Sequence, residues 1–236
     1  MASPPEDAGV ASEERIVDAV REHTHALLGS TITYTESDWA GASRLAGWTR
    51  SHVAAHLAEN ARGFLRVVAG AWSGRAVRMY GSDAERARDI EVGALADGLA
   101  LQIDLDTSAG QLQDVLGRLI GDDTPLQLRA GHVIPARQVA VARLHEVVLH
   151  CFDLHPEADA LDVGTDVGVA LLEFTTARLG GRPDLPAMEL RSDDGFRARI
   201  GADGPPRLVT GPACDLVAWL ARNVISARLT GAISLP

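Results

Sequence analysis

The stretch from Arg137 to Leu154 constrains this chain most, because it is long, strongly apolar and free of glycine and proline. Such a stretch predicts a helix of about four turns, buried over most of its surface. Arg143, Glu146 and His150 fall within roughly 60° of one another on this helix, whereas His145 points to nearly the opposite side. A buried carboxylate is costly unless it is paired, so Glu146 needs a partner. His150, one turn later, is the nearest candidate.

A second long helix, predicted over residues 50–72, carries two histidines one turn apart. Its apolar residues form one stripe at helical spacing, namely Val53, Leu57, Ala61, Phe64 and Val68. His52, His56, Glu59, Asn60 and Gly63 lie on the other side. That side is either a solvated face or the wall of a wet cleft next to the helix of Glu146.

The second reading brings His52 or His56 together with Glu146 and His150. Two imidazoles and a carboxylate leave a coordination position open, which suits catalytic zinc, although nickel, iron and manganese accept the same donors. The alternative is a buried hydrogen-bonded network of glutamate, histidine and arginine without a metal. Spacing by itself leaves both readings open.

Composition narrows the class of protein. The 236 residues are 46% hydrophobic, and the formal net charge is −10 at pH 7. This acidity argues against nucleic acid or an anionic membrane as a partner, and no apolar run reaches the ~18 residues of a membrane span. The first 14 residues lack the basic and apolar regions of a secretory signal, and Cys151 and Cys214 form no CxxC pair. We expect a globular cytoplasmic protein, either a monomer or a weak dimer, that acts on small molecules.

The rest of the chain predicts a mainly α protein of two domains. Residues 1–11 are expected to be a disordered tail, residues 12–155 a helical domain, and residues 156–236 a smaller α+β domain. The helical domain should contain further helices over residues 12–28, 83–96 and 108–120, a polar connection over residues 30–47, and an unassigned region over residues 126–133. In the second domain, helices are predicted over residues 164–179 and 213–223 and strands over residues 187–192, 196–200 and 206–210, with Asp193-Asp194-Gly195 as a hairpin turn.

Three blocks of sequence resemble a known family. Residues 47–61 (GWTRSHVAAHLAENA) are similar to the first motif of the mycothiol-dependent maleylpyruvate isomerases, which are DinB-like metalloenzymes. Residues 79–82 (MYGS) with 90–94 (IEVGA) match the family's second block, and residues 143–154 (RLHEVVLHCFDL) match its third. The resemblance covers residues 12–155, and a weaker one extends over the C-terminal domain.

This resemblance implies a DinB-like four-helix bundle that binds zinc through His52, Glu146 and His150. It also implies a C-terminal domain similar to sterol-carrier proteins, which contributes an arginine from its last helix to the active site. Arg222 is the matching residue here, although the common pattern ends with glycine and then arginine, and this chain has Ala221-Arg222-Asn223. The residues expected to line the pocket are His56, Asn60, Tyr80 and Arg143.

The activity implied is a cis–trans isomerisation. Zinc would hold the thiol of mycothiol as a thiolate, which adds to the double bond of maleylpyruvate, allows rotation, and leaves to give fumarylpyruvate. Glu146 would be a ligand rather than a base. Two alternatives remain: a mycothiol S-transferase, in which the thiol stays attached to another electrophile, and a DinB-like protein that binds a metal without catalysis.

Overall fold

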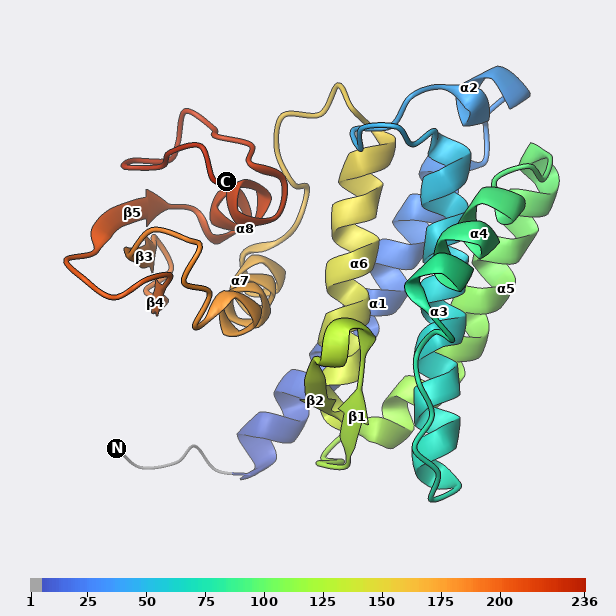
Figure 1. The fold of residues 1–236 in the computed structure, drawn as a ribbon, viewed down its shortest axis with the longest axis horizontal. Coiled ribbons are helices and arrows are strands. Elements are labelled where there is room, and N and C mark those ends of the chain that lie inside the picture. Colours follow the sequence, from blue (N-terminus) through green and yellow to red (C-terminus); the bar gives the residue numbers. More distant parts are fainter. Residues whose placement is uncertain (1–5) are drawn as a thin grey trace. The chain divides into compact units, whose positions relative to one another are not determined.

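The computed structural model describes residues 6–236 and divides them into two compact units, one ending at Pro156 and the other beginning at Glu157. The first unit is mainly helical (Figure 1). It contains, in chain order, α1 (Glu6–Thr31), α2 (Glu36–Ala40), α3 (Arg50–Trp72), α4 (Asp83–Gly93), α5 (Gly98–Leu116), strands β1 (Pro125–Gln127) and β2 (Val133–Pro135), and α6 (Val139–Leu154).

Helix α3 lies at the centre of this unit and packs against α4, α5 and α6, while α1 packs against α5 and α6 (Figure 1). The predicted apolar stripe of α3 is buried along its whole length, at Val53, Leu57, Ala61, Phe64 and Val68. Leu105 of α5 and Val147 of α6 belong to the same core. Burial of these faces fixes which sides of α3 and α6 meet, and thereby positions the polar residues that they carry.

Helix α3 begins at Arg50, as the sequence predicts, because Thr49 and His52 form a reciprocal N-terminal cap. The Thr49 hydroxyl accepts a hydrogen bond from the backbone amide of His52, and Nδ1 of His52 accepts one from the amide of Thr49 at 3.2 Å. The two contacts satisfy amides that have no partner within the helix.

Several predicted boundaries in the first unit are wrong. Helix α1 includes residues 6–11, which were expected to be a tail, and it continues through Gly29; residues 1–5 lie outside the described part of the chain. Helix α5 begins at Gly98 rather than at residue 108. Its first turns alternate exposed Leu99 (71%) and Ile103 (56%) with buried Leu101 and Leu105, so apolar residues do not mark a single face.

Two segments without a predicted structure are ordered. Residues 30–47 include the short helix α2, which Thr35 caps through its side chain. The unassigned region contains strands β1 and β2, an antiparallel pair in which Leu126 is opposite Ile134.

The second unit contains helix α7 (Thr165–Leu179), strands β3 (Met188–Ser192), β4 (Arg197–Ile200) and β5 (Arg207–Gly211), and helix α8 (Ala213–Arg222). The strands form one sheet in the order β4-β3-β5, antiparallel between β3 and β4 and parallel between β3 and β5. Gly195, with φ at +91°, turns the predicted hairpin.

In the part of the chain that the structure describes, no helix has both the length and the apolarity needed to cross a membrane.

Candidate metal centre

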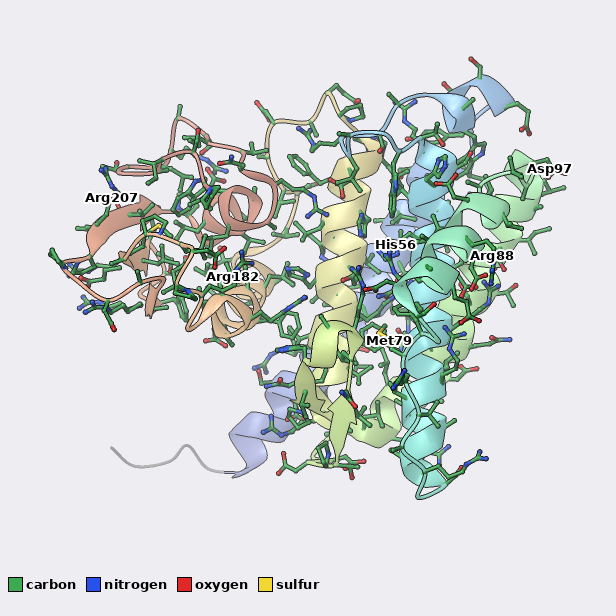
Figure 2. All side chains as sticks on the ribbon, in the orientation of Figure 1. His56, Met79, Arg88, Asp97, Arg182 and Arg207 are labelled. Carbon is green, nitrogen blue, oxygen red and sulfur yellow. The ribbon has the colours of Figure 1, made fainter. Side chains whose placement is uncertain are left out.

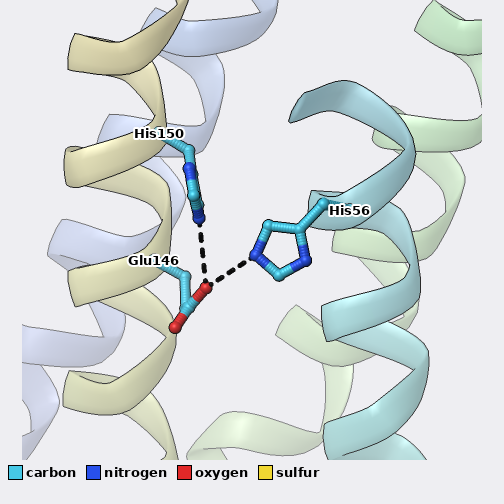
Figure 3. A group of neighbouring side chains, drawn as sticks. All are labelled: His56, Glu146 and His150. Carbon is cyan, nitrogen blue, oxygen red and sulfur yellow. Dashed lines mark hydrogen bonds and ion pairs between the residues drawn. The ribbon is translucent and has the colours of Figure 1, made fainter. Parts of the chain in front are cut away.

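Three potential metal ligands meet where α3 packs against α6. His56 comes from α3, and Glu146 and His150 come from α6 (Figure 3). Oε2 of Glu146 lies 3.1 Å from Nε2 of His56 and 3.4 Å from Nε2 of His150. One potential ligand atom from each residue lies within 4.8 Å of the other two. The α3–α6 contact therefore converts a pair on one helix into a three-residue group.

Burial and mutual hydrogen bonding set the charges in this group. Burial opposes ionisation of Glu146, but hydrogen bonds from His150 and His56 outweigh it and hold the pKa of Glu146 well below its usual value. Burial lowers the pKa of His56 to about 4, although Glu146 opposes this shift. Burial also acts to lower the pKa of His150, but Asp153 and Glu146 raise it overall. Without a metal, the group is therefore an ionised carboxylate between a neutral imidazole, His56, and one that binds a proton more readily than a free histidine, His150.

Both imidazoles have partners on their outer nitrogens. Nδ1 of His150 lies 2.8 Å from Oδ2 of Asp153, whose side chain is fully buried, and this contact turns Nε2 of His150 toward Glu146. Nδ1 of His56 lies 2.9 Å from Nη2 of Arg86, a partly buried residue of α4. The imidazole orientations are therefore held from outside the group.

The group fits a divalent cation. Two imidazoles and one carboxylate are the donors of a catalytic zinc site with three protein ligands. A carboxylate behind a ligating histidine, as Asp153 lies behind His150, is the usual outer partner in such sites. The side chain of Glu146 keeps 22% of its surface exposed, against 7% for His56 and 9% for His150, so solvent reaches the group from the carboxylate side.

His52, which the resemblance implies as a metal ligand, is not part of this group. His56 is the α3 histidine that lies next to Glu146 and His150. Nδ1 of His52 caps α3, and its Nε2 lies 3.3 Å from Oε2 of Glu91 on α4. The cap and the Glu91 contact hold the imidazole at the N-terminal end of α3, one turn before His56. The sequence admitted either histidine, because both lie on the same side of the helix.

Asn60 and Arg143, both predicted to line the pocket, brace α3 against α6. Nη1 of Arg143 donates to Oδ1 of Asn60 at 2.7 Å and to the carbonyl oxygen of Leu57 at 2.9 Å. Arg143 is only 2% exposed, and burial lowers its pKa to about 10 despite the opposing charge of Glu146. Its guanidinium holds together the two helices that carry the group.

Tyr80 lies in the connection between α3 and α4, and its ring contacts an arginine from each of these two helices. The guanidinium carbons of Arg66 and Arg86 lie 5.8 Å and 5.4 Å from the centre of its ring. Burial raises the pKa of Tyr80, and the charge of Arg86 opposes the rise. Gly63 allows this approach, because a Cβ atom at that position would lie 3.4 Å from Cζ of Tyr80 and 2.9 Å from Cγ of Met79.

Arg222, the arginine predicted to be catalytic, is the last residue of α8 in the second unit. Its Nη1 donates to the carbonyl oxygen of Ala221 at 2.9 Å. Asn223 follows in the left-handed conformation, with φ at +57°, and ends the helix. The catalytic role of Arg222 stays a prediction.

Sequence reasoning missed the residues that hydrogen-bond to the outer nitrogens of the two histidines, Asp153 and Arg86. A signal for Asp153 was present, because residues three positions apart on a helix are neighbours and His150 precedes it by three. Nothing in the sequence pointed to Arg86, since it reaches His56 from another helix.

The chain is similar to known proteins over most of its length. Residues 18–155 match the family model described as the mycothiol maleylpyruvate isomerase N-terminal domain. Two solved structures are similar over nearly the whole chain: the mycothiol-dependent maleylpyruvate isomerase and a histidine-to-alanine mutant of it. Each has 22% sequence identity and a TM-score of 0.79, covering 95% of this chain and 96% of the other. At this identity the likeness establishes the fold. No curated protein matches the chain.

Proposed function

Because this chain belongs to the family of the mycothiol maleylpyruvate isomerase N-terminal domain, we propose that it is a metal-dependent isomerase that uses mycothiol to convert maleylpyruvate to fumarylpyruvate. One observation carries the proposal: His56, Glu146 and His150 bring their donor atoms within 4.8 Å of one another. They do so in a fold shared with the solved isomerase.

In this proposal His56, Glu146 and His150 hold a zinc ion. When bound, the ion would supply one piece of chemistry: it would lower the pKa of the mycothiol thiol, which would release its proton to solvent and remain a thiolate at neutral pH. Glu146, already ionised, is a ligand and not a general base. Asp153 keeps Nε2 of His150 directed into the site by accepting from its Nδ1.

The reaction leaves the thiol unchanged. The sulfur of mycothiol forms a bond to one carbon of the cis double bond, and the electron pair of that double bond moves onto the conjugated carbonyl. The carbon–carbon bond, now single, rotates. The electron pair then returns, the carbon–sulfur bond breaks, and the trans isomer and the thiolate are released.

The proposal extends to the architecture. We assign α1, α3, α5 and α6 to a DinB-like four-helix bundle, supported by the packing of α3 and α1 against the same two partners, α5 and α6. The second unit is assigned to the sterol-carrier-like class, and Arg222 to binding of the anionic substrate. We place the enzyme in the cytoplasm.

The direct test is to incubate zinc-loaded protein with mycothiol and maleylpyruvate and to follow fumarylpyruvate by NMR. We expect fumarylpyruvate to form only when both zinc and mycothiol are present, and His56→Ala to abolish its formation while circular dichroism remains that of the wild type. If no fumarylpyruvate forms, the isomerase proposal fails. Thiol-dependent consumption of another electrophile would then support the S-transferase, and no thiol-dependent reaction the non-catalytic protein.

A further inference from the structure

The contact between Arg86 and His56 determines which nitrogen of His56 carries a proton. Nη2 of Arg86 lies 2.9 Å from Nδ1 of His56, and a guanidinium can only donate hydrogen bonds. Nδ1 must therefore accept, so Nε2 carries the proton of the neutral ring and donates it to Glu146 at 3.1 Å. Without a metal, the three side chains form a consistent chain of donors and acceptors.

A cation held by this group would need the opposite arrangement. Nε2 of His56 is the nitrogen directed toward Glu146 and His150 (Figure 3), so its lone pair would have to face the cation. The ring proton would then reside on Nδ1, directly opposite a nitrogen of Arg86 that also donates. Two donors cannot form a hydrogen bond, so occupancy of the site releases Arg86 from His56.

Once released, Arg86 lacks a partner of opposite charge. Among residues 6–236, no carboxylate lies within ion-pairing distance of its guanidinium, whereas Arg66 is paired with Glu59. Its other neighbour is Tyr80, whose ring centre lies 5.4 Å from the guanidinium carbon of Arg86. The Tyr80 hydroxyl accepts a hydrogen bond from Arg86, and it stays neutral because burial raises its pKa. A partly buried guanidinium that has a neutral hydroxyl beside it and no paired carboxylate favours an anionic acceptor, and the Tyr80 hydroxyl can donate its own proton to the same anion.

We propose that Arg86, assisted by Tyr80, binds a carboxylate of the substrate next to the cation, and that coordination of the cation by His56 frees Arg86 for this role. The inference rests on the proposed function, because it concerns the anionic substrate of the same site. It also orders binding: the metal enters first, and the carboxylate then replaces His56 as the acceptor for Arg86.

The test uses the Arg86→Gln variant and maleate, a cis dicarboxylate that resembles one end of maleylpyruvate. In calorimetric titrations of the zinc-loaded protein, we expect Arg86→Gln to weaken maleate binding by about 10- to 100-fold, the range for loss of a hydrogen bond to a charged group. Arg88→Gln is the matched control, because Arg88 lies on the exposed side of α4 (Figure 2). It should bind maleate as the wild type does.

A second measurement tests the release of Arg86. The glutamine side chain offers an oxygen that can accept from Nδ1 of His56, so Arg86→Gln should bind zinc about tenfold more tightly than the wild type in a chelator competition. The inference would be overturned if Arg86→Gln bound maleate as tightly as the wild type, or if the wild type did not bind maleate at all. It would also be overturned if Arg86→Gln bound zinc no more tightly than the wild type. If maleate binding depends on Arg86 but no fumarylpyruvate forms, the carboxylate site stands and the proposed reaction fails.

Discussion

Oδ2 of Asp153 lies 2.8 Å from Nδ1 of His150, one turn along the same helix, and the aspartate side chain has no exposed surface. A fully buried carboxylate is costly unless it is paired, so His150 and Asp153 stabilise each other. The pair also fixes the ring so that Nε2 is directed toward Glu146. The strength of the candidate metal centre should therefore depend on a residue that is not itself a ligand.

Asp153→Asn should weaken zinc binding by about 10- to 100-fold, because the amide removes the negative charge behind His150 and can present a donor to its Nδ1. Competition with a chromophoric chelator measures this affinity. Asp106→Asn, on an exposed position of α5, is the control and should bind zinc like the wild type. Equal affinities for all three proteins would show that Asp153 does not orient the ligand.

The stability of the metal-free protein should fall in mild acid because His56 is buried in its neutral form. Its pKa is about 4 in the folded state, against 6.5 in the unfolded chain, so between these values the unfolded state binds a proton that the folded state does not. The free energy of unfolding should therefore fall as the pH drops from 6.5 to 4, by up to about 3 kcal/mol.

Urea denaturation in the presence of a chelator at pH 6.5 and pH 4.5 measures this effect. His56→Gln should reduce the difference in the free energy of unfolding between the two pH values. His150 acts in the opposite window: its pKa is raised, so its contribution is lost as the pH rises above 6.5. Glu146, with its lowered pKa, contributes above pH 4.5 and loses its contribution only below that value. A wild-type protein equally stable at both pH values would contradict the burial of neutral His56.

Arg143→Met should destabilise the protein by about 2 kcal/mol, because it removes a charged donor from two buried acceptors, Oδ1 of Asn60 and the carbonyl of Leu57. Methionine preserves much of the volume, which limits any cavity. Urea denaturation of the metal-free protein gives the difference, and Arg88→Met should change stability by less than about 0.5 kcal/mol. If the two variants were equally stable, Arg143 would not brace α3 against α6.

The fold was most predictable where one face of an element is apolar and its end is capped by a local motif. Helix α3 has both, a buried stripe and the cap between Thr49 and His52, and it was predicted from its first residue to its last. Helix α5 was predicted to begin ten residues too late, because Leu99 and Ile103 face solvent and interrupt the apolar pattern. Periodicity indicates burial, and it fails where apolar residues are exposed.

The candidate site was predictable within one helix and not between helices. Glu146 and His150 follow from their spacing on α6. The choice between His52 and His56 depends on which turn of α3 lies opposite Glu146, and that is set by how the apolar faces of α3 and α6 pack. The contact of Arg86 with His56 depends in the same way on the packing of α4.

The measurement that tests the account most directly is the zinc content and zinc affinity of His56→Ala and His52→Ala, compared with the wild type by elemental analysis and chelator competition. His56→Ala should lose bound zinc, because it removes one of the three donors, and His52→Ala should retain about one zinc per chain with an affinity within a few-fold of the wild type. Loss of zinc from His52→Ala together with retention by His56→Ala would contradict the centre formed by His56, Glu146 and His150.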